Sequence, residues 1–154
     1  MPQCLNMKAI VQRVTKASVV VDAPAYKASI GNGLCVFLGV EDSDKDAQAI
    51  WIANKLANLR VFRDEQGKMN CSLKDNNGEL LLISQFTLAG DCSKGNRPSF
   101  INAADPEIAE PLVLRVSEIL KTVHEIPVQT GVFGAMMQIE LINDGPVTLI
   151  VERS

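Results

Sequence analysis

The sequence is poor in aromatic and imidazole side chains. Phe, Tyr and Trp make up 5% of the residues, and His124 is the one histidine. A hydrophobic core must therefore be built from Val, Ile, Leu, Ala and Met side chains. A Ser-His-Asp or Cys-His catalytic device needs an imidazole within reach of its nucleophile. Since His124 falls near the end of an expected helix, away from the polar segments described below, we expect it on the surface at a helix end.

Cysteines are few, and their spacing is not that of a metal site. The chain has Cys4, Cys35, Cys71 and Cys92, and no two of them form a Cys-x-x-Cys pair. This argues against zinc-ribbon and thioredoxin chemistry, and no His/Cys cluster suggests a metal. We therefore expect reduced, mostly buried thiols, and neither a metal nor a cofactor.

Long apolar runs and a positive charge excess are also missing. No run reaches membrane-spanning length, and the N-terminus has no long apolar stretch typical of a signal peptide, so we expect no membrane partner and a reducing, cytoplasmic location. The net charge is -3 and the pI about 5.2. Because general affinity for nucleic acid comes from neutralising many phosphates, a long duplex is an unsuitable ligand. An RNA held at one end remains possible, with Lys94 and Arg97 as a local patch.

The remaining composition is that of a single globular domain. The 154 residues are 47% hydrophobic and 21% charged, which is enough apolar material for a core. We expect an extension at residues 1–6 and one domain over 7–154. Helices are predicted over 43–59, capped by Ser43 or Asp42, and over 105–124, with Asp105 as cap and Pro106 at its first position. Pro111 predicts a late start or a bend in the second helix.

Strands are indicated by β-rich or apolar runs. The predicted strands are 8–14 and 17–21, broken near Thr15-Lys16, then 34–40, 79–88, 136–142 and 147–151. Polar, turn-rich residues at 63–78 and a long loop at 89–104 connect them, and long loops are often functional. The fold class expected is α/β, a single compact domain with two main helices packed on a mixed or antiparallel β-sheet or barrel.

Two polar segments are candidates for a site. Ser84, Gln85 and Thr87 bring hydroxyl and amide groups to a strand end, although an outward-facing strand edge would look the same. Gly145-Pro146 interrupts two strand-like runs, either as a plain hairpin turn or as a fixed backbone feature that presents carbonyl groups.

No pair of acids is evident among the candidate carboxylates, which are Glu79, Asp91, Glu140 and Asp144. A general base is therefore hard to find. An enzyme of this composition would act on an already reactive substrate through positioning and backbone N–H groups.

Several separated motifs resemble one known family. The segments MKAIVQRVTKASV, LRVF-x-DE-x-GKMN, SQFTLAGD, NRPSF, QTGVFGAMMQ and NDGPVT occur in the order seen in D-aminoacyl-tRNA deacylases of the bacterial and eukaryotic type. The resemblance runs from about Met7 to the C-terminus. It implies the fold of that family and a homodimer with its active site at the subunit interface. It also implies hydrolysis of the ester that links a D-amino acid, or glycine, to the terminal adenosine of tRNA.

The resemblance also implies roles for individual residues. Gly145-Pro146 would be cis and enter the partner's pocket, where its backbone carbonyl groups exclude L side chains. Ser84, Gln85, Phe86 and Thr87 would line the pocket, and the N–H groups near Phe86 and Thr87 would serve the oxyanion. We rank a nucleophilic Thr87 below a positioning Thr87, because no base is apparent near it. The 2′-OH of the tRNA's terminal ribose would help to activate water.

Three further residues complete the implied site. Phe133 and Met137 resemble the residues that receive the terminal adenine, although core packing is an equal alternative. Arg13 resembles the arginine that orients the Gly-Pro loop; otherwise it is a solvated strand-edge residue. Two other functions stay open: a non-catalytic module that binds RNA ends, and a sister deacylase with a trans Gly-Pro bond.

Overall fold

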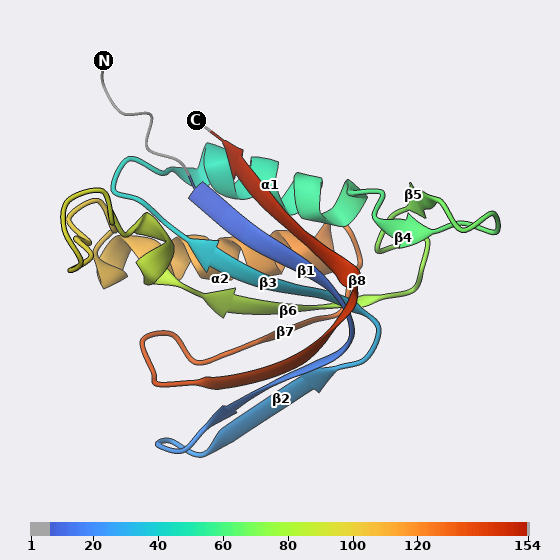
Figure 1. Ribbon diagram of the computed structural model, residues 1–154, viewed down its shortest axis with the longest axis horizontal. Helices are drawn as coiled ribbons and strands as arrows, with labels where there is room; N and C mark the ends of the chain where they lie inside the picture. The colour runs from blue at the N-terminus through green and yellow to red at the C-terminus, as the bar shows by residue number, and fades with distance from the viewer. Residues whose placement is uncertain (1–6, 154) are drawn as a thin grey trace.

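A computed structural model describes residues 7–153, so the extension expected at residues 1–6 lies outside the described residues. Within that range, two helices cover a strongly bent sheet (Figure 1). The elements are, in order, β1 (Met7–Val21), β2 (Tyr26–Ile30), β3 (Gly33–Gly39), α1 (Asp46–Asn58), β4 (Phe62–Arg63), β5 (Met69–Cys71), β6 (Glu79–Ser84), η1 (a 3₁₀ helix, Phe86–Ala89), α2 (Pro106–Thr122), β7 (Val128–Thr130) and β8 (Gln138–Arg153).

The main sheet is mixed and nearly closed into a barrel. Its order is β2-β1-β3-β6-β7, with β8 paired to β1. The pairs β3–β6 and β6–β7 are parallel, and the three pairs made by β1 are antiparallel. The α/β fold class, with two main helices on a mixed sheet, is confirmed.

Both faces of the central strands are buried, which explains their continuous apolar sequences. On β3, Leu34, Val36 and Leu38 join a core that α1 and α2 cover, whereas Cys35 belongs to a second core on the opposite face. β6 alternates in the same way, since Leu80 and Leu82 belong to the first core and Leu81 and Ile83 to the second. A parallel strand that is buried on both faces requires apolar side chains at every position.

The N-terminal runs form one strand rather than two. β1 pairs with β3 from Lys8 to Val14 and with β2 from Ala17 to Val21. The predicted break near Thr15-Lys16 is therefore wrong as an interruption, because β8 pairs with β1 along both halves. Thr15 and Lys16 instead lie where the neighbour of β1 on one edge changes from β3 to β2.

The C-terminal runs also form one strand, β8, and the hairpin alternative at Gly145-Pro146 is wrong. Gln12 pairs with Thr148 and Val14 with Asn143, so residues 144–147 of β8 face the single residue Arg13 of β1. We call residues 143–147 the β8 bulge. A bulge pushes extra backbone out of the sheet while the strand continues on both sides.

The helix limits differ from the prediction mainly at N-termini. α1 begins at Asp46 with Lys45 as its N-cap, because residues 41–44 form a turn in which Glu41 N–H donates to Asp44 Oδ2. The predicted caps Ser43 and Asp42 are therefore wrong. α2 begins at Pro106 with Asp105 at the N-cap position, and Pro111 lies inside the helix. The late helix start that Pro111 predicted is therefore also wrong.

Two connecting regions contain unexpected structure. β4 and β5 form a separate two-stranded sheet within the stretch that was predicted as turns. β6 ends at Ser84 rather than at Leu88, because Phe86–Ala89 form the 3₁₀ helix η1. Of the described cysteines only Cys35 is buried, while Cys71 is partly buried and Cys92 is exposed, so the prediction of mostly buried thiols is wrong. Burial raises the pKa of the Cys35 thiol to about 12, so that this thiol stays protonated.

Candidate active site

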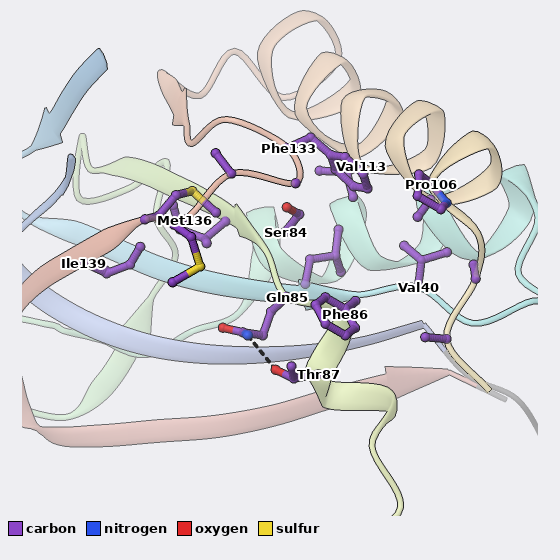
Figure 2. A pocket seen from close by; sticks show the side chains of 18 residues that line it. Val40, Ser84, Gln85, Phe86, Thr87, Pro106, Val113, Phe133, Met136 and Ile139 are labelled. Atoms are coloured by element: carbon purple, nitrogen blue, oxygen red, sulfur yellow. Dashed lines mark hydrogen bonds between the residues drawn. The ribbon is translucent and has the colours of Figure 1, made fainter. Parts of the chain in front are cut away.

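A cavity of about 620 Å³ opens between the end of β6, the start of α2 and the segment before β8 (Figure 2). Its walls include six residues singled out from the sequence: Ser84, Gln85, Phe86, Thr87, Phe133 and Met137. None of the described residues that line it is an Asp, Glu, His, Lys, Arg, Cys or Tyr. The pocket therefore offers hydroxyl, amide and apolar groups, and no side chain that exchanges a proton near neutral pH.

The SQFTL segment enters the pocket because β6 stops where β3 stops. Leu38 pairs with Ser84, and the chain then turns into η1. Gly39 makes this close approach possible, since a Cβ there would lie 2.9 Å from the Cβ of Leu88 and 3.1 Å from the Gln85 carbonyl oxygen. The first N–H groups of a helical turn have no acceptor within the turn. Those of Phe86 and Thr87 occupy this position in η1.

The side chains of this segment interact with one another. Gln85 Nε2 donates to Thr87 Oγ1 at 2.5 Å, and the Thr87 residue is exposed (Figure 2). An amide cannot act as a general base, and a donated hydrogen bond withdraws electron density from the hydroxyl oxygen. This hydrogen bond fixes the orientation of the Thr87 hydroxyl, and Gln85 supplies no base to it.

Phe133 and Met137 line the pocket from the segment between β7 and β8. Phe133 packs against the helix-covered core and Met137 against the second core, and both remain partly exposed. Gly131 leaves room for Met137, because a Cβ there would lie 2.5 Å from the Met137 sulfur. An aromatic ring and a thioether at one end of an apolar pocket suit the face of a nucleobase.

Gly145, Pro146 and Arg13 lie outside this pocket. Gly145 and Pro146 are exposed in the β8 bulge, and the bond between them is cis, in contrast to the trans geometry of the sister-deacylase alternative. Arg13 is only 3% exposed, so the solvated alternative is wrong. Its Nε donates to the Asp144 carbonyl oxygen at 2.8 Å, and its Nη1 donates to Val61 O at 2.6 Å.

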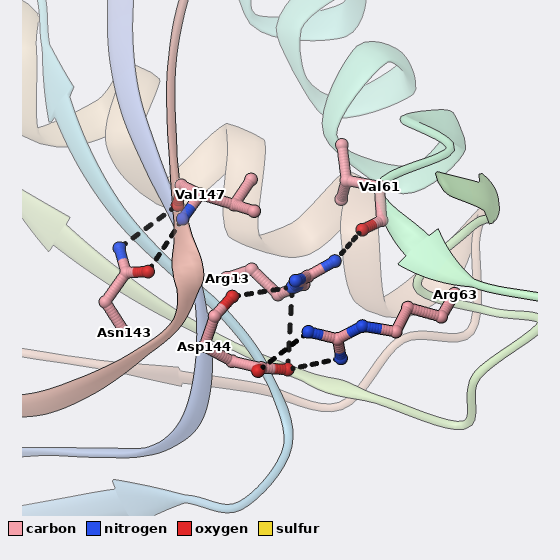
Figure 3. A network of polar contacts seen from close by, with 6 residues as sticks. All are labelled: Arg13, Val61, Arg63, Asn143, Asp144 and Val147. Carbon is pink, nitrogen blue, oxygen red and sulfur yellow. Dashed lines mark hydrogen bonds and ion pairs between the residues drawn. The ribbon is translucent and has the colours of Figure 1, made fainter. Parts of the chain in front are cut away.

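The ends of the β8 bulge are held by Asn143. Its Oδ1 accepts a hydrogen bond from Val147 N–H at 2.7 Å, and its Nδ2 donates to Val147 O at 3.1 Å (Figure 3). The side chain thus occupies both backbone groups of Val147, as a neighbouring strand would. Gly145 has φ +152°, and a Cβ there would lie 2.7 Å from Val147 N, so a side chain would force the bulge to change shape.

Asp144 carries the charge of the bulge. Arg63 Nη1 and Nη2 each donate to one carboxylate oxygen at 3.1 Å. This hydrogen-bonded contact, together with the positive charges of Arg63 and Arg13, lowers the pKa of Asp144. A lowered pKa means that the ion pair is complete at neutral pH and is lost only as the pH falls through that lowered value.

Sequence comparisons identify the family. A family model described as D-Tyr-tRNA(Tyr) deacylase matches residues 10–152. A D-aminoacyl-tRNA deacylase of Chlorobaculum parvum is 50% identical over 146 residues, which cover 95% of this chain and 97% of the relative. Another, from Geotalea uraniireducens, is 54% identical over 147 residues, covering 95% and 93%. The chain belongs to the D-aminoacyl-tRNA deacylase family. It is accordingly a hydrolase, and its activity is that of a D-aminoacyl-tRNA deacylase.

Solved structures agree with the deacylase fold. A structure described as c-Myc DNA Unwinding Element Binding Protein matches with a TM-score of 0.87 at 42% identity, covering 96% of this chain and 99% of that chain. A probable eukaryotic D-amino acid tRNA deacylase matches with a TM-score of 0.83, covering 97% and 100%. At 15% identity, this second match concerns the fold alone.

The pocket has one further wall that no sequence motif indicated. It is formed by the end of β3 and the start of α2, with Val40, Ala104, Pro106, Ala109 and Val113. Ala104 ends the long loop and Ala109 lies in the first turn of α2, a pattern that is equally typical of ordinary helix packing. Glycine or alanine near a predicted site is a weak signal, because such residues act by leaving space.

Other candidate groups lie elsewhere. His124 follows the end of α2, and its Nε2 is 2.6 Å from Asn54 Oδ1 of α1, away from the residues that line the pocket. In residues 7–153, no three His, Cys, Asp or Glu side chains gather as metal ligands. No helix in the described range is long and apolar enough to cross a membrane.

Proposed function

We propose that the pocket binds the 3′-terminal aminoacyl-adenosine of tRNA and hydrolyses its ester when the amino acid is D or glycine. The observation that carries the proposal is a pocket lined by Ser84, Gln85, Phe86 and Thr87 to which no ionisable side chain of residues 7–153 contributes. An aminoacyl ester is already reactive, so orienting it and stabilising the developing negative charge can supply the needed acceleration. The adenine would stack against Phe133 and Met137.

In the proposed reaction, water attacks the ester carbonyl and the ribose oxygen leaves with a proton. The N–H groups of Phe86 and Thr87 would stabilise the oxyanion that forms; removing one such donor typically costs a factor of about 10²–10³ in rate. The vicinal 2′-OH of the terminal ribose would assist the attacking water. Thr87 and Gln85 would position the substrate, because their mutual hydrogen bond leaves neither as a base.

Chiral selection would come from a partner subunit. Gly145 and Pro146 are exposed and do not line the pocket of their own chain, which fits their insertion into the pocket of a second copy in a homodimer. Their carbonyl groups would face the α-carbon of the substrate, where an L side chain would clash and a D side chain or hydrogen would not. Selection by exclusion makes no contact with the amino-acid side chain, so many D-amino acids would be accepted. We propose a cytoplasmic location, since charged tRNA is used there.

The test is to incubate the protein with D-Tyr-tRNA and L-Tyr-tRNA and to follow ester loss. Hydrolysis of the D ester and sparing of the L ester are expected. Equal rates on both esters would overturn the chiral filter. Binding of tRNA without loss of either ester would favour the RNA-end-binding module instead.

A further inference from the structure

The residue directly before Gly145 is held from two sides. Arg13 Nε donates to the backbone carbonyl of Asp144 at 2.8 Å and lies 3.5 Å from its Oδ2. Arg63 binds both carboxylate oxygens of the same residue at 3.1 Å (Figure 3). One guanidinium therefore fixes mainly the backbone of Asp144, and the other fixes its side chain.

The two arginines connect the β8 bulge to different parts of the molecule. Arg13 belongs to β1, the strand with which β8 already pairs, and its side chain is 4% exposed. Arg63 belongs to β4, whose strand partner is β5 in the separate two-stranded sheet, and its side chain is 51% exposed. Among the described contacts, the Arg63–Asp144 pair is the ionic link between this small sheet and the bulge.

We propose that the Arg63–Asp144 ion pair is a positioning device that sets the direction of Gly145-Pro146 and thereby the degree of discrimination between D- and L-aminoacyl esters. The inference rests on the proposed function of the bulge as a chiral filter. Neither Arg63 nor Asp144 lines the pocket, so neither touches the reacting atoms within one chain. Their effect is transmitted through the backbone, because Asp144 and Gly145 share a peptide bond.

The geometry explains why this pair matters although it is partly exposed. An isolated surface ion pair contributes little, but two parallel hydrogen bonds to one carboxylate fix an orientation as well as a distance. A filter that works by steric exclusion is sensitive to sub-ångström displacement of the excluding atoms. Glu79 lines the same polar depression as Arg63 and Asp144, yet in the described residues it forms no ion pair with Arg63.

The experiment compares Arg63→Ala and Arg63→Lys with the wild-type protein on L-Tyr-tRNA and D-Tyr-tRNA. Because both esters use the same tRNA, the ratio of their kcat/KM values cancels effects on tRNA binding. The expected result for Arg63→Ala is an increase of about two- to fivefold in the L-to-D ratio, the size that corresponds to one surface pair. The L-to-D ratio of Arg63→Lys should lie between those of the wild-type protein and Arg63→Ala, since lysine keeps the charge but loses the two-point contact.

The matched control is Arg115→Ala. Arg115 Nε donates to Asp46 Oδ1 at 2.9 Å in an arginine–aspartate pair of comparable exposure that joins α2 to α1, far from the bulge in the sequence. This variant should leave the L-to-D ratio unchanged. A charge reversal at Asp144 is not a clean test, because it would place a second cation against Arg13. If Arg63→Ala and Arg115→Ala both keep the wild-type ratio, the Arg63 pair has only a structural role and the proposal is wrong.

Amide hydrogen exchange gives a readout that does not depend on activity. Val147 N–H donates to Asn143 Oδ1 within the bulge, and a peptide that spans residues 138–150 reports on it. Faster exchange of this peptide in Arg63→Ala, with unchanged exchange over β3, supports the positioning role. If the exchange of the 138–150 peptide in Arg63→Ala equals that of the wild-type protein, the positioning role is overturned. A wild-type protein that cleaves neither ester would refute the proposed function, and the exchange result would still decide whether Arg63 positions the bulge.

Discussion

The pocket and the β8 bulge are built on opposite physical principles. Among the residues that the structure describes, no charged side chain lines the pocket, and its shape comes from packed residues of β6, η1, α2 and the segment before β8. The bulge exposes Gly145 and Pro146, and it is held by Arg13 and Arg63 and by its own Asp144 and Asn143. The pocket can therefore orient and stabilise without proton transfer by a side chain, whereas the bulge uses charge only to hold uncharged backbone in place.

We therefore expect substitutions in the two regions to affect different kinetic quantities. Substitutions in the pocket should change binding and rate for D and L esters alike. Substitutions in the bulge should change the ratio between them. Substitutions that change only the rate, or only the L-to-D ratio, would show that the two regions act separately.

The largest effect is expected from Gly145→Ala. With φ at +152° and a Cβ 2.7 Å from Val147 N and 2.8 Å from Val147 Cγ2, the bulge must change shape. Misplacement on the scale of 1 Å can cost about 100-fold, so we expect D-ester hydrolysis to fall by about that factor or the L-to-D ratio to rise similarly. Gly67→Ala is the control, because Gly67 has φ +77° and nothing within 4 Å of a Cβ. Wild-type kinetics of Gly145→Ala on both esters would contradict the filter.

A smaller effect is expected from Phe133→Ala. Loss of one aromatic stacking surface should raise KM by about tenfold, with a smaller change in kcat. The L-to-D ratio should stay constant, because Phe133 would contact adenine rather than the amino acid. Steady-state kinetics with both esters measure KM and the ratio. The control is Val123→Ala, because Val123 is 65% exposed and does not line the pocket. An unchanged KM would mean that Phe133 only packs in the core.

The loop beside the pocket should contribute through charge. Asp91 and Ser99 exchange backbone hydrogen bonds and close a loop that carries Lys94 and Arg97, and Phe100 packs edge-to-face on Phe86 of η1. Neither cation has an ion-pair partner among the described residues. Replacing both with alanine should reduce the salt dependence of KM by about one to two units of log–log slope.

The control for that variant must carry the same charge change. Lys27→Ala with Lys121→Ala also takes the net charge from -3 to -5 (-3 minus 2), but these residues lie outside the loop. Equal salt slopes in the two double variants would show that only the net charge matters. The L-to-D ratio should be unaffected in both.

The smallest effect is expected from Thr87→Ala. A positioning hydroxyl should cost less than about tenfold in kcat, whereas loss of a nucleophile costs several orders of magnitude. Thr87→Ser should restore the wild-type rate if the hydroxyl acts only through its contact with Gln85. Single-turnover hydrolysis of D-Tyr-tRNA measures both variants. A loss of about a thousandfold or greater in Thr87→Ala would favour the nucleophilic role.

Sequence patterns predicted the elements that are defined by local periodicity. The apolar run of β3, the amphipathic α1 and the Pro106 start of α2 were found because burial on two faces, or on one helix face, leaves a readable pattern. The β8 bulge was not distinguished from a hairpin, because Asn143, Gly145 and Pro146 suit either. Only the pairing of both flanking runs with β1 decides between them.

The lining of the pocket was predictable where its residues lie together in a motif. Ser84, Gln85, Phe86 and Thr87 all line one pocket, as the family resemblance implied, and their roles in the reaction stay predictions. Arg63 gave no signal, because its partner Asp144 is 81 positions away and either residue alone reads as ordinary surface charge. Contacts between distant exposed residues depend on the fold itself, which is why the ionic support of the bulge required the structure.

The most direct test asks whether the pocket of one subunit uses the bulge of the other. Ala135→Trp would fill the pocket that Ala135 lines, and Gly145→Ala would disable the bulge. The Ala135→Trp homodimer should then be inactive, and the Gly145→Ala homodimer should hydrolyse the D ester about 100-fold more slowly or with a similarly raised L-to-D ratio. A heterodimer of the two, purified by two different tags, contains one site in which an intact pocket meets an intact bulge. The account predicts about half of the wild-type rate per dimer, as two-fold symmetry requires. A heterodimer with neither more D-ester hydrolysis than both homodimers nor the wild-type L-to-D ratio would contradict it.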